Sequence, residues 1–321
     1  MRVRLIIPVL LAGFLGLLPA HSEDSARQAI EKALPYLEEE GTWWIEKKDC
    51  VSCHHTSFFV WAKDLALEQG FAIDRDTLDG QREWMWNSFL EEIEADPDNP
   101  DSKPKPGEVK GDRNVEGVSQ FLVSASQSAA PEEVIQRLVE VVKSNQGENG
   151  HWSPGGQLPR QERSKTETQW ASNQWAELAL AAHGEEPERK TETWKEGVPA
   201  VTSEWWMLNL LLRPSNPHSL KNLLDRQKED GGWSWKTGEP SDPSGTGQAL
   251  IALGRAGKTG EHAAAVARAR QFLVETQDEE GHWETLNTKD RSDATRVSNF
   301  WGTAWAVIGL LESSASEVTG D

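Results

Sequence analysis

The chain has 321 residues and a formal net charge of −19. Nucleic acids and anionic membrane surfaces require a basic face, so both are excluded as partners of a chain with this charge balance. The length allows two domains of average size, but the repeats described below favour one.

The N-terminus has the pattern of a secretory signal peptide. Two arginines precede an apolar run that ends at Leu18, and small residues then lead to an acidic segment from Glu23. The run is too short for a comfortable transmembrane helix. We therefore expect residues 1–22 to be a signal peptide and residues 23–321 to form a periplasmic or secreted protein with no membrane span.

The two cysteines of the chain stand in the segment Cys50-Val51-Ser52-Cys53-His54. This is the spacing at which c-type haem is attached: two thiols add to the vinyl groups and the next imidazole ligates the iron. The motif predicts haem c bound covalently through Cys50 and Cys53, with His54 as the proximal iron ligand.

Other interpretations of this motif stay open. A zinc site made by Cys50, Cys53, His54 and His55 would need four ligands very close in sequence, whereas tetrahedral sites usually draw on two separated pairs. A disulfide between the cysteines would close too short a loop to stabilise the fold much. Free thiols without a cofactor are the remaining alternative.

A repeated motif organises the rest of the chain. Residues 146–152, 227–233 and 277–283 each read Gln-x-x-x-Gly-x-Trp, and residues 37–43 keep only the Gly-x-Trp part. Each copy follows an amphipathic helical stretch. The glycine falls where a left-handed residue ends a helix, the tryptophan can fold back on the last turn, and the glutamine can bond backbone groups of a neighbouring helix.

Helical stretches alternate between charge-striped ones and ones that are apolar almost all round, which we interpret as outer and inner helices. No segment has the alternation of a β-strand. Six outer–inner pairs are enough to close on themselves, so the sequence predicts an all-α fold, an (α/α)6 toroid, over residues 23–321. The pairs begin near residues 25, 74, 131, 187, 216 and 261.

At these motifs the chain resembles the squalene–hopene cyclase-like family of terpenoid cyclase and prenyltransferase toroids. The resemblance implies a toroid whose glutamine–tryptophan motifs tie outer helices together. The family's acidic Asp-x-Asp-Asp-Thr segment corresponds to residues 242–246, where Ser244 and Gly245 replace the acid pair. Without paired carboxylates no strong proton donor is apparent, so we expect the scaffold without cyclase chemistry. Exported toroid proteins that carry Cys-x-x-Cys-His are also similar.

If the hairpins alternate regularly, the loops that enter the six inner helices share one rim. Asp242 and Asp293 are the weak candidates there for general acid–base work, although loop acids in so acidic a chain are usually solvated. Met207, on the inner helix opposite the first hairpin, is a weak candidate for the distal haem ligand, and the favoured interpretation is an ordinary core residue. The rim gathers Arg113, Lys165, Glu204, Asp242, Arg291, Asp293 and Arg296.

Most of the 16 tryptophans belong to the caps or to equivalent core positions of the repeats. The ones that remain free to line a pocket are Trp44, Trp170, Trp205, Trp235 and Trp301.

The leading functional hypothesis is an exported haem-c protein for electron transfer or a redox-linked task, with a redox partner protein. One alternative is a toroid enzyme that acts on a polysaccharide or a terpenoid-like lipid, which predicts a cleft lined by tryptophan and at least two carboxylates. The other is a non-catalytic module that binds a protein partner. The sequence does not fix the oligomeric state.

Overall fold

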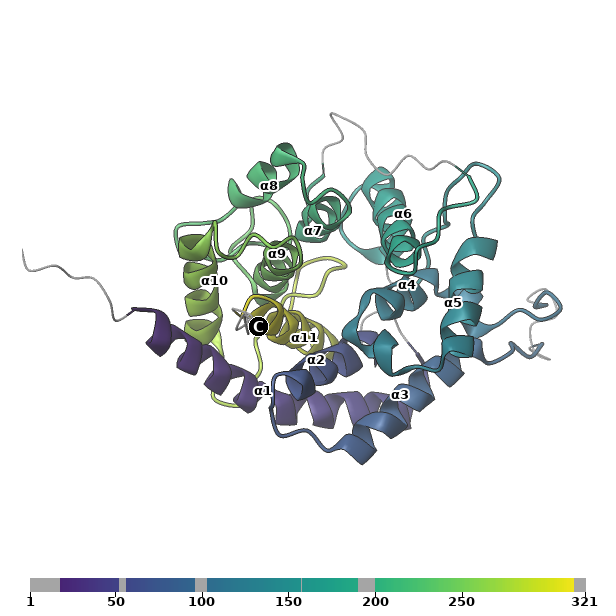
Figure 1. Cartoon of the computed structure of the whole chain (residues 1–321), viewed down its shortest axis with the longest axis horizontal. Coiled ribbons are helices and arrows are strands. Elements are labelled where there is room, and N and C mark those ends of the chain that lie inside the picture. The colour runs from purple at the N-terminus through teal and green to yellow at the C-terminus, as the bar shows by residue number, and fades with distance from the viewer. Residues whose placement is uncertain (1–17, 52–55, 96–102, 157, 190–199, 315–321) are drawn as a thin grey trace, which may run out of the picture.

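A computed structural model of the chain describes residues 18–51, 56–95, 103–156, 158–189 and 200–314. Eleven α-helices lie in this part of the chain, and the pairings of extended backbone found there are isolated bridges. Six of the helices form a closed inner ring in which each contacts the next and the last contacts the first (Figure 1). In ring order they are α2 (Thr56–Glu68), α4 (Val115–Val123), α6 (Lys165–Ala182), α7 (Ser203–Leu212), α9 (Pro243–Arg255) and α11 (Arg296–Glu312).

Five outer helices pack around this ring, each against an inner neighbour (Figure 1). The outer partner expected before α7 falls largely at residues 190–199, outside the described residues. The all-α toroid predicted from the hairpin pattern is therefore confirmed. The outer helices are α1 (Leu18–Lys48), α3 (Arg75–Leu90), α5 (Glu132–Ser144), α8 (Pro217–Leu224) and α10 (Ala263–Thr276).

The two kinds of helix differ in burial as their composition predicts. Eight of the nine residues of α4 are buried, as are the first eleven of α9, whereas α5 buries one stripe of aliphatic side chains. Apolar residues all round a helix can be buried only where neighbours surround it, and that requires the inner ring. None of the described helices is long and apolar enough to cross a membrane.

The three complete Gln-x-x-x-Gly-x-Trp motifs cap outer helices in the way the sequence predicts. At the third, Gly281 has a φ of 92°, and the Gln277 amide donates to the carbonyls of Gly281 and Ala29, both at 2.9 Å. The indole of Trp283, which follows the helix, donates to the carbonyl of Leu273 on α10 at 2.8 Å. The first two motifs repeat this pattern, so each glutamine joins one outer segment to the next.

The fourth, incomplete motif behaves differently from the expectation. Gly41 does not end a helix, since α1 continues through it to Lys48. Its lack of a side chain serves packing instead: a Cβ there would lie 2.7 Å from the ring of Phe59 on α2. With leucine in place of the glutamine, no amide is available to bridge the turn.

Candidate functional site

The inner helices begin at one rim of the toroid, where side-chain caps fix their first turns. Asn114, Ser164, Asp242 and Thr295 each accept a hydrogen bond from a backbone N–H of the following turn, which satisfies one of the free donors at the helix start. The long polar loops between hairpins also lie at this rim. It is therefore the place where helix starts and loop side chains can converge on one cavity.

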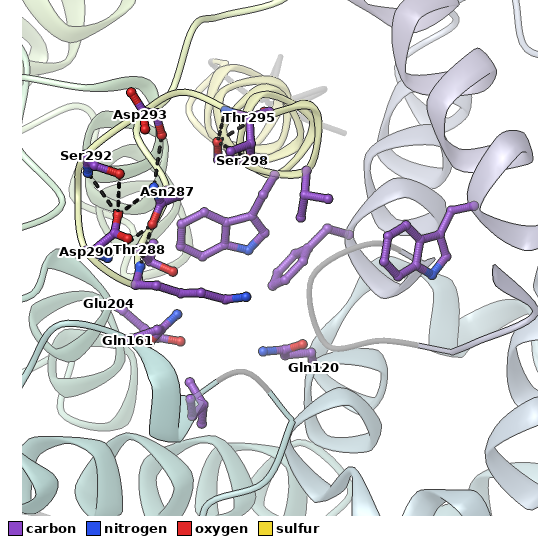
Figure 2. Close-up of a pocket in the computed structure, with 16 residues that line it drawn as sticks. Gln120, Gln161, Glu204, Asn287, Thr288, Asp290, Ser292, Asp293, Thr295 and Ser298 are labelled. Atoms are coloured by element: carbon purple, nitrogen blue, oxygen red, sulfur yellow. Dashed lines mark hydrogen bonds between the residues drawn. The ribbon is translucent and has the colours of Figure 1, made fainter. Parts of the chain in front are cut away.

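A cavity of about 570 Å³ opens at this rim (Figure 2). Its aromatic lining comes from three helices that contact one another, two at the start of the chain and one at its end: Trp44 of α1, Phe58 of α2 and Trp301 of α11. Its opposite side is polar, with Gln120 of α4 and Glu204 of α7. Only closure of the ring brings these five side chains to one space.

One wall of the cavity is the loop that leads into α11. Asn287 and Asp293 hold it closed, with the Asn287 N–H donating to the Asp293 carbonyl at 2.9 Å. Within the turn, the Asp290 carboxylate accepts from the Ser292 hydroxyl at 2.6 Å and from the Asn287 amide at 2.9 Å (Figure 2). The bonds from Ser292 first, then the one from Asn287, lower the pKa of Asp290 to about 2. Asp293 lies at the rim, as the sequence predicts: it is exposed and lines the cavity.

Beneath this loop, a buried ion pair supports the floor. The Glu204 carboxylate accepts from the Arg163 guanidinium at 2.6 Å and from the Trp175 indole at 2.9 Å. The side chain of Arg163 is 0% exposed and that of Glu204 is 2% exposed, so neither charge is solvated by bulk water. Two further nitrogens of Arg163 have no hydrogen-bond partner among the described residues.

A second buried carboxyl group lies close behind Glu204. One oxygen of Glu116 accepts from the Ser172 hydroxyl and from the Gly155 N–H, while the other has no partner among the described residues. Burial raises the pKa of Glu116, and the charge of Glu204 raises it further, against the opposing effect of the hydrogen bonds. Glu116 is thus held in its neutral form more readily than an ordinary glutamate.

Two glutamine amides complete the polar lining (Figure 2). Gln120 is 3% exposed, and Gln161 lies at the end of the loop after the short turn Leu158–Arg160. The side-chain oxygen of each has no hydrogen-bond partner among the described residues. An amide at a cavity wall whose oxygen accepts no hydrogen bond from the protein can accept one from a hydroxyl group of a ligand.

Asp242, the other acid that the sequence placed at the rim, stabilises the start of α9 and does not face the cavity. It caps α9: one carboxylate oxygen accepts from the Gly245 N–H at 2.9 Å and the other from the Trp235 N–H at 2.6 Å. The guanidinium of Arg291 lies 3.5 Å away, and burial raises the pKa of the carboxyl group. Asp242 does not line the cavity.

The residues of the haem motif fall partly outside the described residues, since Cys53 and His54 lie there. Cys50 is exposed and lines a separate cavity of about 590 Å³ together with Arg113. Although the residue as a whole is exposed, partial burial of its thiol raises the pKa of Cys50. Met207, the candidate distal ligand, is fully buried in α7.

Two of the five candidate tryptophans line the pocket, and the other three are core residues. Of the five that were free to line a pocket, Trp44 and Trp301 do so, while Trp170, Trp205 and Trp235 are buried and absent from its lining.

Sequence reasoning missed Glu116 and the two glutamines. A signal for the acids exists, because residues 116, 167 and 204 are all glutamates in the first turn of an inner helix. Their burial, however, depends on which loop covers each helix start.

Fold and site together define an all-α toroid with an aromatic and polar pocket at the rim where its inner helices begin. No family profile matches the sequence. Among solved structures, the chain is similar to a possible member of the GH105 family from Salmonella enterica, with 13% identity over 96% of this chain and 98% of that one and a TM-score of 0.47. A possible GH105 member from Klebsiella pneumoniae shows 14% identity over 97% and 98%, with a TM-score of 0.45. A glycosyl hydrolase family 88 protein from Bacteroides vulgatus shows 10% identity over 90% and 98%, also with a TM-score of 0.45.

These comparisons correct two expectations. The squalene–hopene cyclase-like resemblance is wrong, since the matching structures are named as GH105 and GH88 proteins. The haem-c electron-transfer function is wrong with it, since the same names are those of glycosyl hydrolases.

Both errors have a physical cause. The Gln-x-x-x-Gly-x-Trp motif reports how an outer helix is capped and joined to its neighbour, and such capping is compatible with more than one kind of toroid. The haem motif is only five residues long, so it fixes neither a cofactor nor a function. At identities of 10–14% and TM-scores below 0.5, the comparisons themselves carry no inference about this chain's substrate.

Proposed function

We propose that this protein is an enzyme that binds an oligosaccharide in the rim pocket and hydrolyses a glycosidic bond there. The observation that carries this proposal is the composition of the lining. Three aromatic side chains stand on one side of a cavity of about 570 Å³, and amides, hydroxyls and carboxylates stand on the other. A sugar ring has the same two characters, with apolar C–H faces and a hydroxyl-bearing edge.

A terpenoid-like lipid is a poorer match to this lining. It would cover Gln120 and Gln161 without offering hydrogen bonds to their unpartnered amide oxygens, and an unpaired buried polar group costs about 1–3 kcal/mol. A saccharide hydroxyl can both donate and accept, so it satisfies amides in either orientation. The polar wall therefore favours the polysaccharide alternative over the lipid one.

In the proposed reaction, water attacks the anomeric carbon and the bond from that carbon to the leaving sugar oxygen breaks. The leaving oxygen gains a proton and the attacking water loses one. Asp293 is the acid placed to exchange protons with the substrate, because its exposed carboxyl group lines the pocket. Glu204 is fixed at the floor of the pocket by its ion pair with Arg163, where it is placed to accept a hydrogen bond from a sugar hydroxyl.

The N-terminal export signal supports the same proposal. It directs the mature chain to the periplasm or the exterior, where polysaccharides are available as substrates.

The test is a binding and turnover assay with soluble oligosaccharides, using tryptophan fluorescence for binding and release of reducing ends for hydrolysis. We expect Trp301→Ala to weaken binding by about tenfold, because it removes a stacking face. Asp293→Asn is expected to lower kcat by about 100-fold or more, a larger effect than its effect on binding.

The matched control is Trp86→Ala, which removes a half-buried tryptophan of α3 that does not line the pocket. Its binding constant should equal that of the parent chain. Saccharide binding without any turnover would contradict the proposed hydrolysis and leave a binding module. No binding of any saccharide would overturn the proposal altogether.

A further inference from the structure

The polar wall of the rim pocket carries an excess of negative charge. Asp290 and Asp293 stand exposed on the loop before α11, and both line the cavity. Lys289 is the one basic side chain among the described residues of the lining. The third lining carboxylate, Glu204, is already neutralised by its buried pair with Arg163.

The negative charge of Asp290 persists over the pH range in which proteins usually work. The hydrogen bonds from Ser292 and Asn287 lower the pKa of Asp290 to about 2, so this carboxylate stays ionised in mildly acidic solution. Those bonds also fix the orientation of the turn. The charge is thus part of a built loop and does not depend on a flexible side chain.

The aromatic side of the pocket favours the same kind of ligand. The faces of Trp44, Phe58 and Trp301 carry negative electrostatic potential, which attracts a cation placed over a ring. Gln120 adds an independent sign of a polar ligand, because it is 3% exposed, lines the cavity and has an unpartnered amide oxygen.

We propose that the pocket selects a saccharide unit that carries a protonated amine, an amino sugar, over a neutral or uronic acid unit of the same size. This inference rests on the proposed function and specifies its substrate class. The ammonium group would lie between the acidic loop and an aromatic face, where each attracts it. A uronate carboxylate would instead face Asp290 and Asp293 and be repelled.

The experiment compares three disaccharides by isothermal titration calorimetry at low ionic strength: a glucosamine disaccharide, its fully N-acetylated counterpart and a uronate-containing disaccharide. We expect the glucosamine disaccharide to bind about tenfold more tightly than the acetylated one, and the uronate most weakly. Raising the salt concentration should narrow these differences.

Substitutions in the pocket test which residues cause the preference for the amine. Asp290→Asn and Asp293→Asn keep the shape of the loop residues and should each reduce the preference for the amine, while Lys289→Met should increase it. Glu148→Gln removes one negative charge from an exposed turn outside the pocket lining, and we expect it to leave the preference unchanged. This control separates a pocket effect from general attraction to an acidic protein.

The outcomes distinguish the inference from the function on which it rests. Equal binding of the amine and its acetylated counterpart, or tighter binding of the uronate, would overturn the inference while the saccharide site stands. An amine preference that Glu148→Gln reduces as much as Asp293→Asn would also overturn it. If none of the three sugars binds, both proposals are wrong.

Discussion

Glu116 is a carboxyl group with 1% exposure, set in the first turn of an inner helix. It illustrates how a single residue at this rim is governed by its surroundings. Burial raises its pKa because ionisation would leave a charge with little solvation, and the neighbouring charge of Glu204 acts in the same direction. One of its oxygens has no partner among the described residues, so a neutral amide can take its place at little cost.

The residue-scale prediction concerns Glu116→Gln. The pKa of Glu116 is higher in the folded chain than in the unfolded chain. Between these two pKa values the unfolded chain therefore binds fewer protons than the folded chain. The stability of the parent chain should therefore fall over this window, by up to about 1.4 kcal/mol per pH unit, relative to a variant that cannot ionise. Thermal unfolding followed from pH 4 to pH 8 measures the difference.

The control for Glu116→Gln is Glu148→Gln at an exposed turn, which should run parallel to the parent chain at every pH. A parallel curve for Glu116→Gln as well would mean that Glu116 ionises normally in the folded protein.

At the scale of elements, α9 and α11 approach each other backbone to backbone. A Cβ added at Gly247 would collide with the carbonyl of Trp305, and one added at Gly309 would collide with the backbone of Gly247. This contact matters to the site because α11 also carries Trp301 and Ser298 into the pocket. A shift of α11 would therefore move part of the lining.

We predict that Gly247→Ala destabilises the protein by about 2–3 kcal/mol, because overpacking between rigid backbones outweighs the better helix propensity of alanine. Gly80→Ala, in the outer helix α3 with open space around it, is the matched control and should stabilise by up to about 1 kcal/mol. Urea unfolding measures both. Stabilisation by both substitutions would show that α9 and α11 can separate freely.

At the scale of the whole molecule, the ring is closed by contacts between the two ends of the chain. Helices α10 and α11 pack against α1 and α2, and Gln277 of the last motif reaches the Ala29 carbonyl on α1. These contacts join residues about 250 apart in sequence, so they form only when the full set of hairpins has assembled.

We expect Gln277→Ala to lower the free energy of unfolding by about 1–3 kcal/mol, since two buried backbone carbonyls lose a partner. Gln271→Ala, on the exposed face of α10, removes a hydrogen bond to the exposed Glu275 and should change stability by less than about 0.5 kcal/mol. Chemical denaturation of the two variants makes the comparison. Equal losses would show that the third motif does not hold the ring closed.

The site was only partly predictable at this scale. Asp293 and Glu204 were expected at the rim, and Trp44 and Trp301 were among the tryptophans free to line a pocket; all four line it. Asp242 was expected there too but serves as a helix cap. The difference between Asp293 and Asp242 is one of loop geometry, because Asp242 folds onto the backbone of Trp235 and Gly245.

The sequence by itself determined the helices, their inner or outer position and the capping at Gly150, Gly231 and Gly281, because periodicity and turn chemistry act over a few residues. It did not determine the function, and short motifs led there to a family and a function that are wrong. The tertiary structure alone decided which side chains share a cavity, which carboxyl groups are buried and which indoles face a pocket. Those properties depend on contacts between segments that are distant in sequence, and these contacts cannot be predicted from local sequence patterns.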